Sequence, residues 1–116
     1  MNALTTGELK KMMESREDFV LVDVLSKKYY KQQHIKGAVN IPLSEGNFKR
    51  SVSRTITDKN KKIVVYCASL ECMASPTAAK TLDMMGYKNV FDYESGIKDW
   101  IGAGLPIENT SNENKQ

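Results

Sequence analysis

The feature that most constrains the fold is an uninterrupted apolar run, Ile63–Tyr66, in the middle of the chain. The run is β-branched and aromatic without polar alternation, which is typical of a strand buried on both faces of a parallel sheet. Cys67 follows it directly, and Ser75 with Pro76 then suits the N-cap and first turn of a helix. We therefore predict strand, loop and helix over residues 62–86, with a thiol at the carboxyl end of the strand.

Further strands and helices alternate along the rest of the chain. We predict strands at Phe19–Val22 and Asn89–Tyr93, and a short strand between a turn at Gly37 and a stop at Pro42. An N-terminal helix should begin at a capping box formed by Thr5 and Glu8. Alternation of this kind indicates an α/β fold with a mainly parallel sheet. Sites in such sheets lie at the carboxyl ends of the strands, where Cys67 is expected.

A late helix and a tail complete the predicted organisation. The helix should bury Ile97, Trp100 and Ile101 on one face. Residues 1–107 are predicted to form one domain, and the polar residues 108–116 a disordered tail. His34 and Asp23 are expected to have structural roles.

Composition narrows the class of protein. The 116 residues are 41% hydrophobic and 27% charged, as in an ordinary soluble domain, and the net charge is only +3. No apolar run approaches the length of a membrane span, and the basic residues lack the density of a nucleic-acid site. Two cysteines five positions apart favour a reducing compartment. We therefore predict a cytoplasmic protein that binds neither nucleic acid nor a membrane.

The loop after the central strand carries the candidate chemistry. A helix N-terminus close to Cys67 would lower the pKa of its thiol and stabilise a bound anion, yet a buried structural cysteine fits the position equally well. Cys72 is either a resolving thiol or a residue that fills space in the loop. Two cysteines and one distant histidine do not make a metal site. The remaining loop residues are Ala68, Ser69, Leu70, Glu71, Met73, Ala74 and Ser75.

Five segments, in order, resemble the signatures of a single-domain rhodanese. They are Asp23-Val24, His34–Pro42, Val65–Cys67, Ala78–Leu82 with Gly86–Val90, and Ser95–Trp100 with Gly104–Pro106. The resemblance implies a five-stranded, mainly parallel sheet flanked by helices on both faces. It also implies a sulfurtransferase without metal or organic cofactor, in which Cys67 takes a sulfane sulfur as a persulfide and passes it to an acceptor.

The chain also departs from the rhodanese pattern. Leu25 stands where arginine is common, the loop is longer, and no Arg or Lys lies between Cys67 and Ala79, whereas Glu71 adds a negative charge. Thiosulfate, a dianion, would lack charge-assisted donors. We therefore expect a carrier that receives sulfur from a low-molecular-weight or protein persulfide rather than from thiosulfate. The acceptor would be a protein or a small thiol.

Other functions fit parts of this pattern. A thiol redox switch would use Cys67 and Cys72 alone, and a rhodanese-like binding module would use neither. A cysteine-based phosphatase or arsenate reductase is disfavoured, because it needs an arginine to hold the oxyanion and the loop has none.

Overall fold

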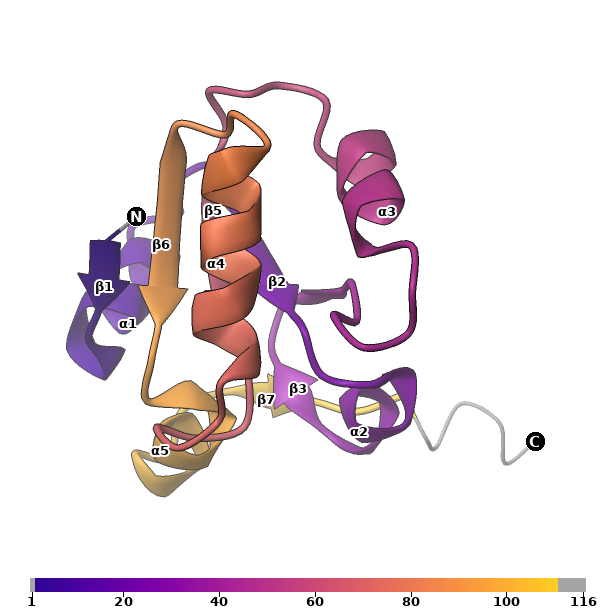
Figure 1. Cartoon of the computed structure of the whole chain (residues 1–116). Coiled ribbons are helices and arrows are strands. Elements are labelled where there is room, and N and C mark those ends of the chain that lie inside the picture. The colour runs from indigo at the N-terminus through magenta and orange to yellow at the C-terminus, as the bar shows by residue number, and fades with distance from the viewer. Residues whose placement is uncertain (1, 111–116) are drawn as a thin grey trace.

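A five-stranded parallel sheet forms the centre of the computed structural model, which describes residues 2–110 (Figure 1). The strand order is β1-β6-β5-β2-β4, and every pair is parallel. The strands are β1 (Asn2–Leu4), β2 (Val20–Asp23), β4 (Val39–Asn40), β5 (Lys62–Tyr66) and β6 (Asn89–Tyr93). The predicted α/β fold with a five-stranded parallel sheet is confirmed.

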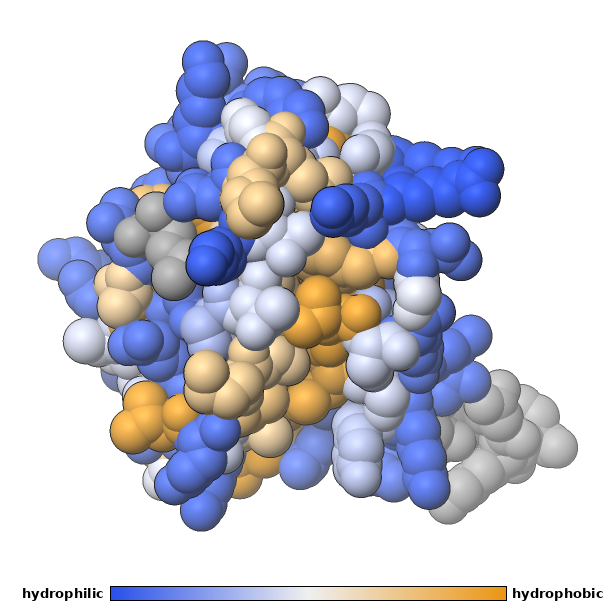
Figure 2. Space-filling view, in the orientation of Figure 1, coloured by the Kyte–Doolittle hydropathy of each residue, from blue (hydrophilic) through white to orange (hydrophobic). Residues whose placement is uncertain are grey.

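Helices cover both faces of this sheet. They are α1 (Thr6–Glu14), α2 (Lys27–Gln32), α3 (Phe48–Thr55), α4 (Ala74–Met84) and α5 (Gly96–Gly102). Helices α3 and α4 pack on one face, and α1 and α5 on the other. In the orientation of Figure 1, apolar side chains reach the surface between α4 and α3 (Figure 2). One apolar core layer lies between each face of the sheet and the helices that cover it.

Strand β5 lies at the middle of both core layers. Ile63 and Val65 belong to the layer under α3 and α4, while Val64 and Tyr66 belong to the layer under α1 and α5. All four side chains are fully buried. The prediction that this apolar run is buried on both faces is confirmed, and the strand forms a rigid support for the residue that follows it.

The predicted start of the first helix is also confirmed. The Thr5 hydroxyl accepts a hydrogen bond from the Glu8 backbone N–H at 3.1 Å, and the Glu8 carboxylate accepts one from the Thr5 N–H at 2.9 Å. This reciprocal pair satisfies two donors that a helix N-terminus leaves free.

Three very short strands were not predicted. One is β1, and the other two, β3 (His34–Ile35) and β7 (Ile107–Glu108), form a separate antiparallel pair. Glu108, which we assigned to the start of the tail, lies opposite His34 in this pair. Residues 111–116 of the predicted tail lie outside the described residues.

Two sequence predictions about helices were wrong. Helix α4 begins at Ala74 with Met73 as its N-cap, so Ser75 lies inside the first turn and is buried. No side chain caps this helix, and its first turn is closed at the Met73 carbonyl, which accepts hydrogen bonds from both the N–H and the hydroxyl of Thr77. Ile101 is 37% exposed. The indole N–H of Trp100 donates to the Pro106 carbonyl at 2.8 Å. This bond helps to fix how α5 is turned about its own axis, with Trp100 buried and Ile101 partly exposed.

Within residues 2–110, no helix is both long enough and apolar enough to span a membrane.

Candidate active site

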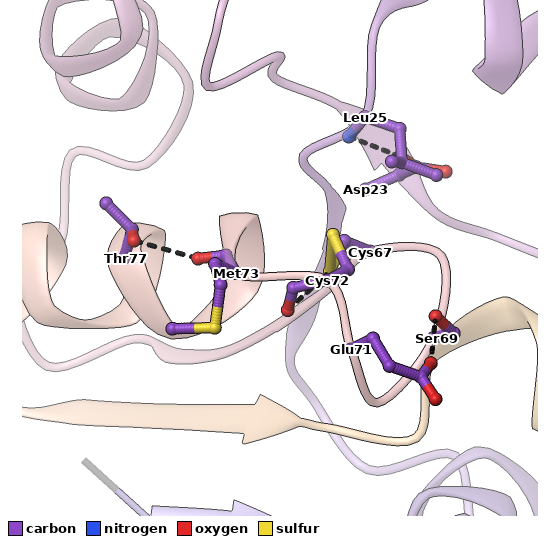
Figure 3. Close-up of a disulfide and its surroundings, with 8 residues drawn as sticks. All are labelled: Asp23, Leu25, Cys67, Ser69, Glu71, Cys72, Met73 and Thr77. Atoms are coloured by element: carbon purple, nitrogen blue, oxygen red, sulfur yellow. Dashed lines mark hydrogen bonds between the residues drawn. A yellow bond between two sulfur atoms is a disulfide. The ribbon is translucent and has the colours of Figure 1, made fainter.

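Cys67 lies one residue beyond β5, at the carboxyl edge of the sheet and at the start of the loop that leads to α4 (Figure 3). Its side chain is fully buried. Strand β2 ends beside it, where Asp23 pairs with Tyr66 in the parallel register. The position expected from the sequence for a reactive group in this fold is therefore the position that the thiol occupies.

A disulfide joins Cys67 to Cys72 within this loop (Figure 3). Their Cα atoms are 6.4 Å apart, within the usual range for disulfides. The Cys72 N–H donates to the Ser69 carbonyl at 3.1 Å, which turns the chain back over Cys67. The sequence left the role of Cys72 open, and the structure shows that the loop brings the two sulfur atoms together.

The Cys67 sulfur also lies 3.6 Å from the Cys72 carbonyl oxygen. This contact belongs to the oxidised loop. Stabilisation of the sulfur by the helix N-terminus, expected from the sequence, stays a prediction for the reduced loop.

The start of α5 holds the inner half of the loop. The Ile97 N–H donates to the Cys67 carbonyl at 3.0 Å, and the Lys98 N–H donates to the Ala68 carbonyl at 2.9 Å. Gly96 makes this approach possible, because a Cβ there would lie 2.7 Å from backbone atoms of Cys67, Ala68 and Ser69. The sequence placed Gly96 only within the segment Ser95–Trp100, since the loop that it touches is far away along the chain.

The outer half of the loop faces solvent. Leu70 and Met73, which flank Cys72 on either side, are 69% and 70% exposed. Glu71 is exposed too, and its own backbone N–H and the Ser69 hydroxyl, 2.9 Å away, hold the pKa of its carboxyl below the usual value. Glu71 is therefore an anion at neutral pH.

An open pocket adjoins this outer half. Lys98 brings a positive charge to it, and Glu71 and Asp99 bring two negative charges. Sequence reasoning missed Lys98 because the residue comes from α5 and not from the loop. The remaining lining residues are Ser69, Leu70, Ser95 and Gly102.

A second, smaller pocket reaches the loop at Ala68 and carries no charged side chain. Leu25 lies on its wall, in the place where the rhodanese pattern favours arginine. The other lining residues are Tyr29, Gln32, Gln33 and Ile97. An approach to the loop from this side therefore meets neutral groups only.

Buried polar groups lie beneath and beside the loop. Asp23 accepts hydrogen bonds from the Leu25 N–H and the Tyr66 hydroxyl, both at 2.8 Å, yet burial still raises the pKa of its carboxyl. Burial also raises the pKa of Asp92 on β6, and the Ser75 hydroxyl that faces it opposes this shift only in part. Ser75 and Asp92 make no hydrogen bond of normal geometry.

The single histidine is engaged elsewhere. The Nδ1 atom of His34 lies 2.7 Å from the Tyr30 carbonyl, its ring stacks on that of Tyr30, and Nε2 is 3.7 Å from Glu108. These contacts tie α2 to the β3–β7 pair. In the described part of the chain, no three His, Cys, Asp or Glu side chains are grouped to hold a metal ion.

Comparison with known proteins gives one consistent result. A family model described as a rhodanese-like domain matches residues 5–103. The thiosulfate sulfurtransferase PspE of Escherichia coli is 37% identical over 78 residues, which cover 67% of this chain and 70% of PspE. The HTH-type transcriptional regulator Rv0324 of Mycobacterium tuberculosis is 33% identical over 107 residues, which cover 92% of this chain but only 45% of the regulator.

Solved structures agree with these sequence matches. A thiosulfate sulfurtransferase from Pseudomonas aeruginosa superposes with a TM-score of 0.82 at 26% identity. The match covers 97% of this chain and 21% of that protein. This chain therefore corresponds to a part of several larger proteins.

Proposed function

Because the chain belongs to the rhodanese-like family, we propose that it is a sulfurtransferase that carries a sulfane sulfur on Cys67 as a persulfide. The observation that supports this most directly is the place of Cys67, at the carboxyl end of the central strand and in the loop before α4. The relative PspE bears the name of a thiosulfate sulfurtransferase, which supports the same class of reaction.

The reaction begins with the loop reduced. The Cys67 thiolate attacks the outer sulfur of a donor, the donor's S–S bond breaks, and the donor leaves as a thiolate. We expect the N-terminus of α4, which begins two residues after Cys72, to favour both the thiolate and the persulfide anion through its N–H groups and its dipole. An acceptor thiol then attacks the outer sulfur and regenerates Cys67. Splitting the transfer at this covalent intermediate gives ping-pong kinetics.

We further propose that the donor is a low-molecular-weight or protein persulfide rather than thiosulfate. Residues 68–78 contain no Arg or Lys, and the Lys98 charge in the adjoining pocket is outnumbered by those of Glu71 and Asp99. A dianion gains little in such surroundings. The uncharged pocket at Ala68 suits a thiol-bearing chain. Since the reaction needs a thiolate, we place the protein in a reducing compartment, the cytoplasm.

The test is the intact mass of the reduced protein after incubation with glutathione persulfide, a cysteine-desulfurase persulfide or thiosulfate. We expect Cys72→Ala to gain one sulfur atom from the persulfides and much less from thiosulfate, and Cys67→Ala to gain none. If Cys72→Ala takes up no sulfur from any donor, the sulfurtransferase proposal is wrong.

The disulfide itself supports a second candidate, a thiol redox switch. In that case Cys67 and Cys72 would oxidise and reduce reversibly without ever holding an extra sulfur atom. The same mass measurement separates the two functions, because a switch loses two hydrogen atoms under mild oxidation and gains no sulfur from a persulfide.

A further inference from the structure

We propose that Cys72 is a resolving residue, which releases the sulfur held on Cys67 as sulfide and leaves the disulfide behind. This inference rests on the proposed function, since it needs a persulfide on Cys67. It changes the outcome of the reaction, because a carrier that only hands sulfur to an acceptor has no use for a second thiol.

A persulfide offers two sulfur atoms to a nucleophile. Attack on the outer sulfur transfers it to the attacking thiol, whereas attack on the inner sulfur expels the outer one as sulfide. The inner sulfur is Cys67 Sγ, and the Cys67 side chain has no exposed surface. Burial of the inner sulfur in this closed loop favours attack from solution on the outer sulfur.

Cys72 is placed to attack the inner sulfur. Its sulfur is bonded to Cys67 Sγ in the structure, so the loop can bring the two atoms to bonding distance. The turn closed by the Cys72 N–H and the Ser69 carbonyl aims the residue back at the end of β5. On the other side, α5 fixes the carbonyls of Cys67 and Ala68 through two N–H groups. The attacked atom is thus held while the attacking residue folds over it.

The step balances without an added oxidant. The Cys72 thiolate attacks Cys67 Sγ, the bond between that sulfur and the outer sulfur breaks, and hydrosulfide leaves with the electron pair. Two thiol sulfurs are oxidised to a disulfide, and the sulfane sulfur is reduced to sulfide. A dithiol must then reduce the disulfide to complete the cycle.

The difference in exposure between the two cysteines determines which sulfur the reducing dithiol attacks. Cys72 is partly exposed and lies between the exposed side chains of Leu70 and Met73, whereas Cys67 is covered. Thiol–disulfide exchange depends on which sulfur the attacking thiolate can reach. A dithiol therefore attacks Cys72 and expels Cys67 as a thiolate, which is the form that the next donor needs.

The experiment loads the reduced protein with glutathione persulfide, removes the excess by gel filtration and follows the protein without any reductant. Free sulfide and intact mass are measured over time for the wild type, Cys72→Ser and Met84→Ser. Met84 is an exposed sulfur-bearing residue at the far end of α4 and serves as the control.

We expect the wild type and Met84→Ser to release one sulfide per chain and to end two hydrogen atoms lighter than the reduced protein. Cys72→Ser should keep its added sulfur. An intramolecular attack commonly exceeds attack from solution by orders of magnitude, so sulfide release should slow at least about 100-fold in this variant.

If the wild type holds its persulfide as long as Cys72→Ser does, the resolving role is wrong and the sulfurtransferase proposal stands. If Cys72→Ser takes up no sulfur in the loading step, both proposals are wrong.

Discussion

Two loops leave the carboxyl edge of the sheet next to each other, and they are held in different ways (Figure 3). The loop after β2 is organised by hydrogen bonds: Asp23 receives the Leu25 N–H, and Asn40 donates to the carbonyls of both residues, at 3.0 and 2.9 Å. The loop after β5 is held by contact with α5 and by one disulfide. Only the second loop is closed by a covalent bond that depends on a redox state.

The difference between these loops shows how one sheet edge can combine a fixed part with a chemically variable part. The Asp23 carboxylate is fully buried and satisfied by two donors, so it stabilises one conformation whatever the redox state. The β5 loop closes a ring only when Cys67 and Cys72 are oxidised. A persulfide on Cys67 therefore requires this loop to be open while the neighbouring loop stays in place.

The largest loss of stability should come from Gly96→Ala, which disrupts the contact between α5 and the β5 loop. The added Cβ would lie 2.7 Å from three backbone atoms, and the residue has a φ of +72°. Strain and overpacking together should lower the free energy of unfolding by about 4 kcal/mol. The measurement is urea unfolding, together with sulfur uptake by intact mass, which should be lost.

Gly104→Ala is the matched control for this substitution. Gly104 has a φ of +73°, but nothing lies within 4 Å of a Cβ placed there. Gly104→Ala should lose only the stability that an alanine loses in this left-handed backbone conformation, without a steric clash. If the two variants lose the same stability and both still take up sulfur, α5 does not hold the loop.

A smaller effect is expected from Asp23→Ala, which removes the two hydrogen bonds that the Asp23 carboxylate accepts. The Leu25 N–H and the Tyr66 hydroxyl would lose their acceptor, and one part-buried and one buried unsatisfied donor should together cost about 3 kcal/mol. Urea unfolding measures this loss. Sulfur uptake by the variant that remains folded should be unchanged. A loss of uptake in fully folded protein would show that Asp23 serves the chemistry and not only the fold.

What could be predicted from the sequence are the features that depend on neighbouring residues in the chain, whereas features that depend on distant partners were missed. Long apolar runs identified β2, β5 and β6, and the order of loop residues identified Cys67 and Cys72 as candidates. The strands β1, β3 and β7 consist of two or three residues and exist because of partners far along the chain, as with His34 and Glu108. Lys98 and the role of Gly96 were missed for that reason too, because tertiary packing brings α5 to the loop.

The smallest predicted change in the free energy of unfolding is that of Asp92→Asn, and it should distinguish Asp92 from the other buried aspartate, Asp23. Burial raises the pKa of Asp92, with the Glu94 charge adding to the shift, so the folded protein binds the proton more tightly than the unfolded chain. The resulting stabilisation is complete below the ordinary aspartate pKa and is lost as the pH rises through the raised pKa. Asp92→Asn cannot ionise, and it should be more stable than the wild type at pH 7.

We expect this gain to be about 1 kcal/mol, the scale for a buried polar group without a full set of partners. Urea unfolding between pH 4 and pH 7.5 measures it, and the gain should vanish toward the acid end. Asp23→Asn should instead lose stability at every pH, because one of its two donors would face an amide N–H₂ group. A gain for Asp92→Asn that does not change with pH would mean that Asp92 has the same pKa in the folded and the unfolded chain, so that burial does not raise it.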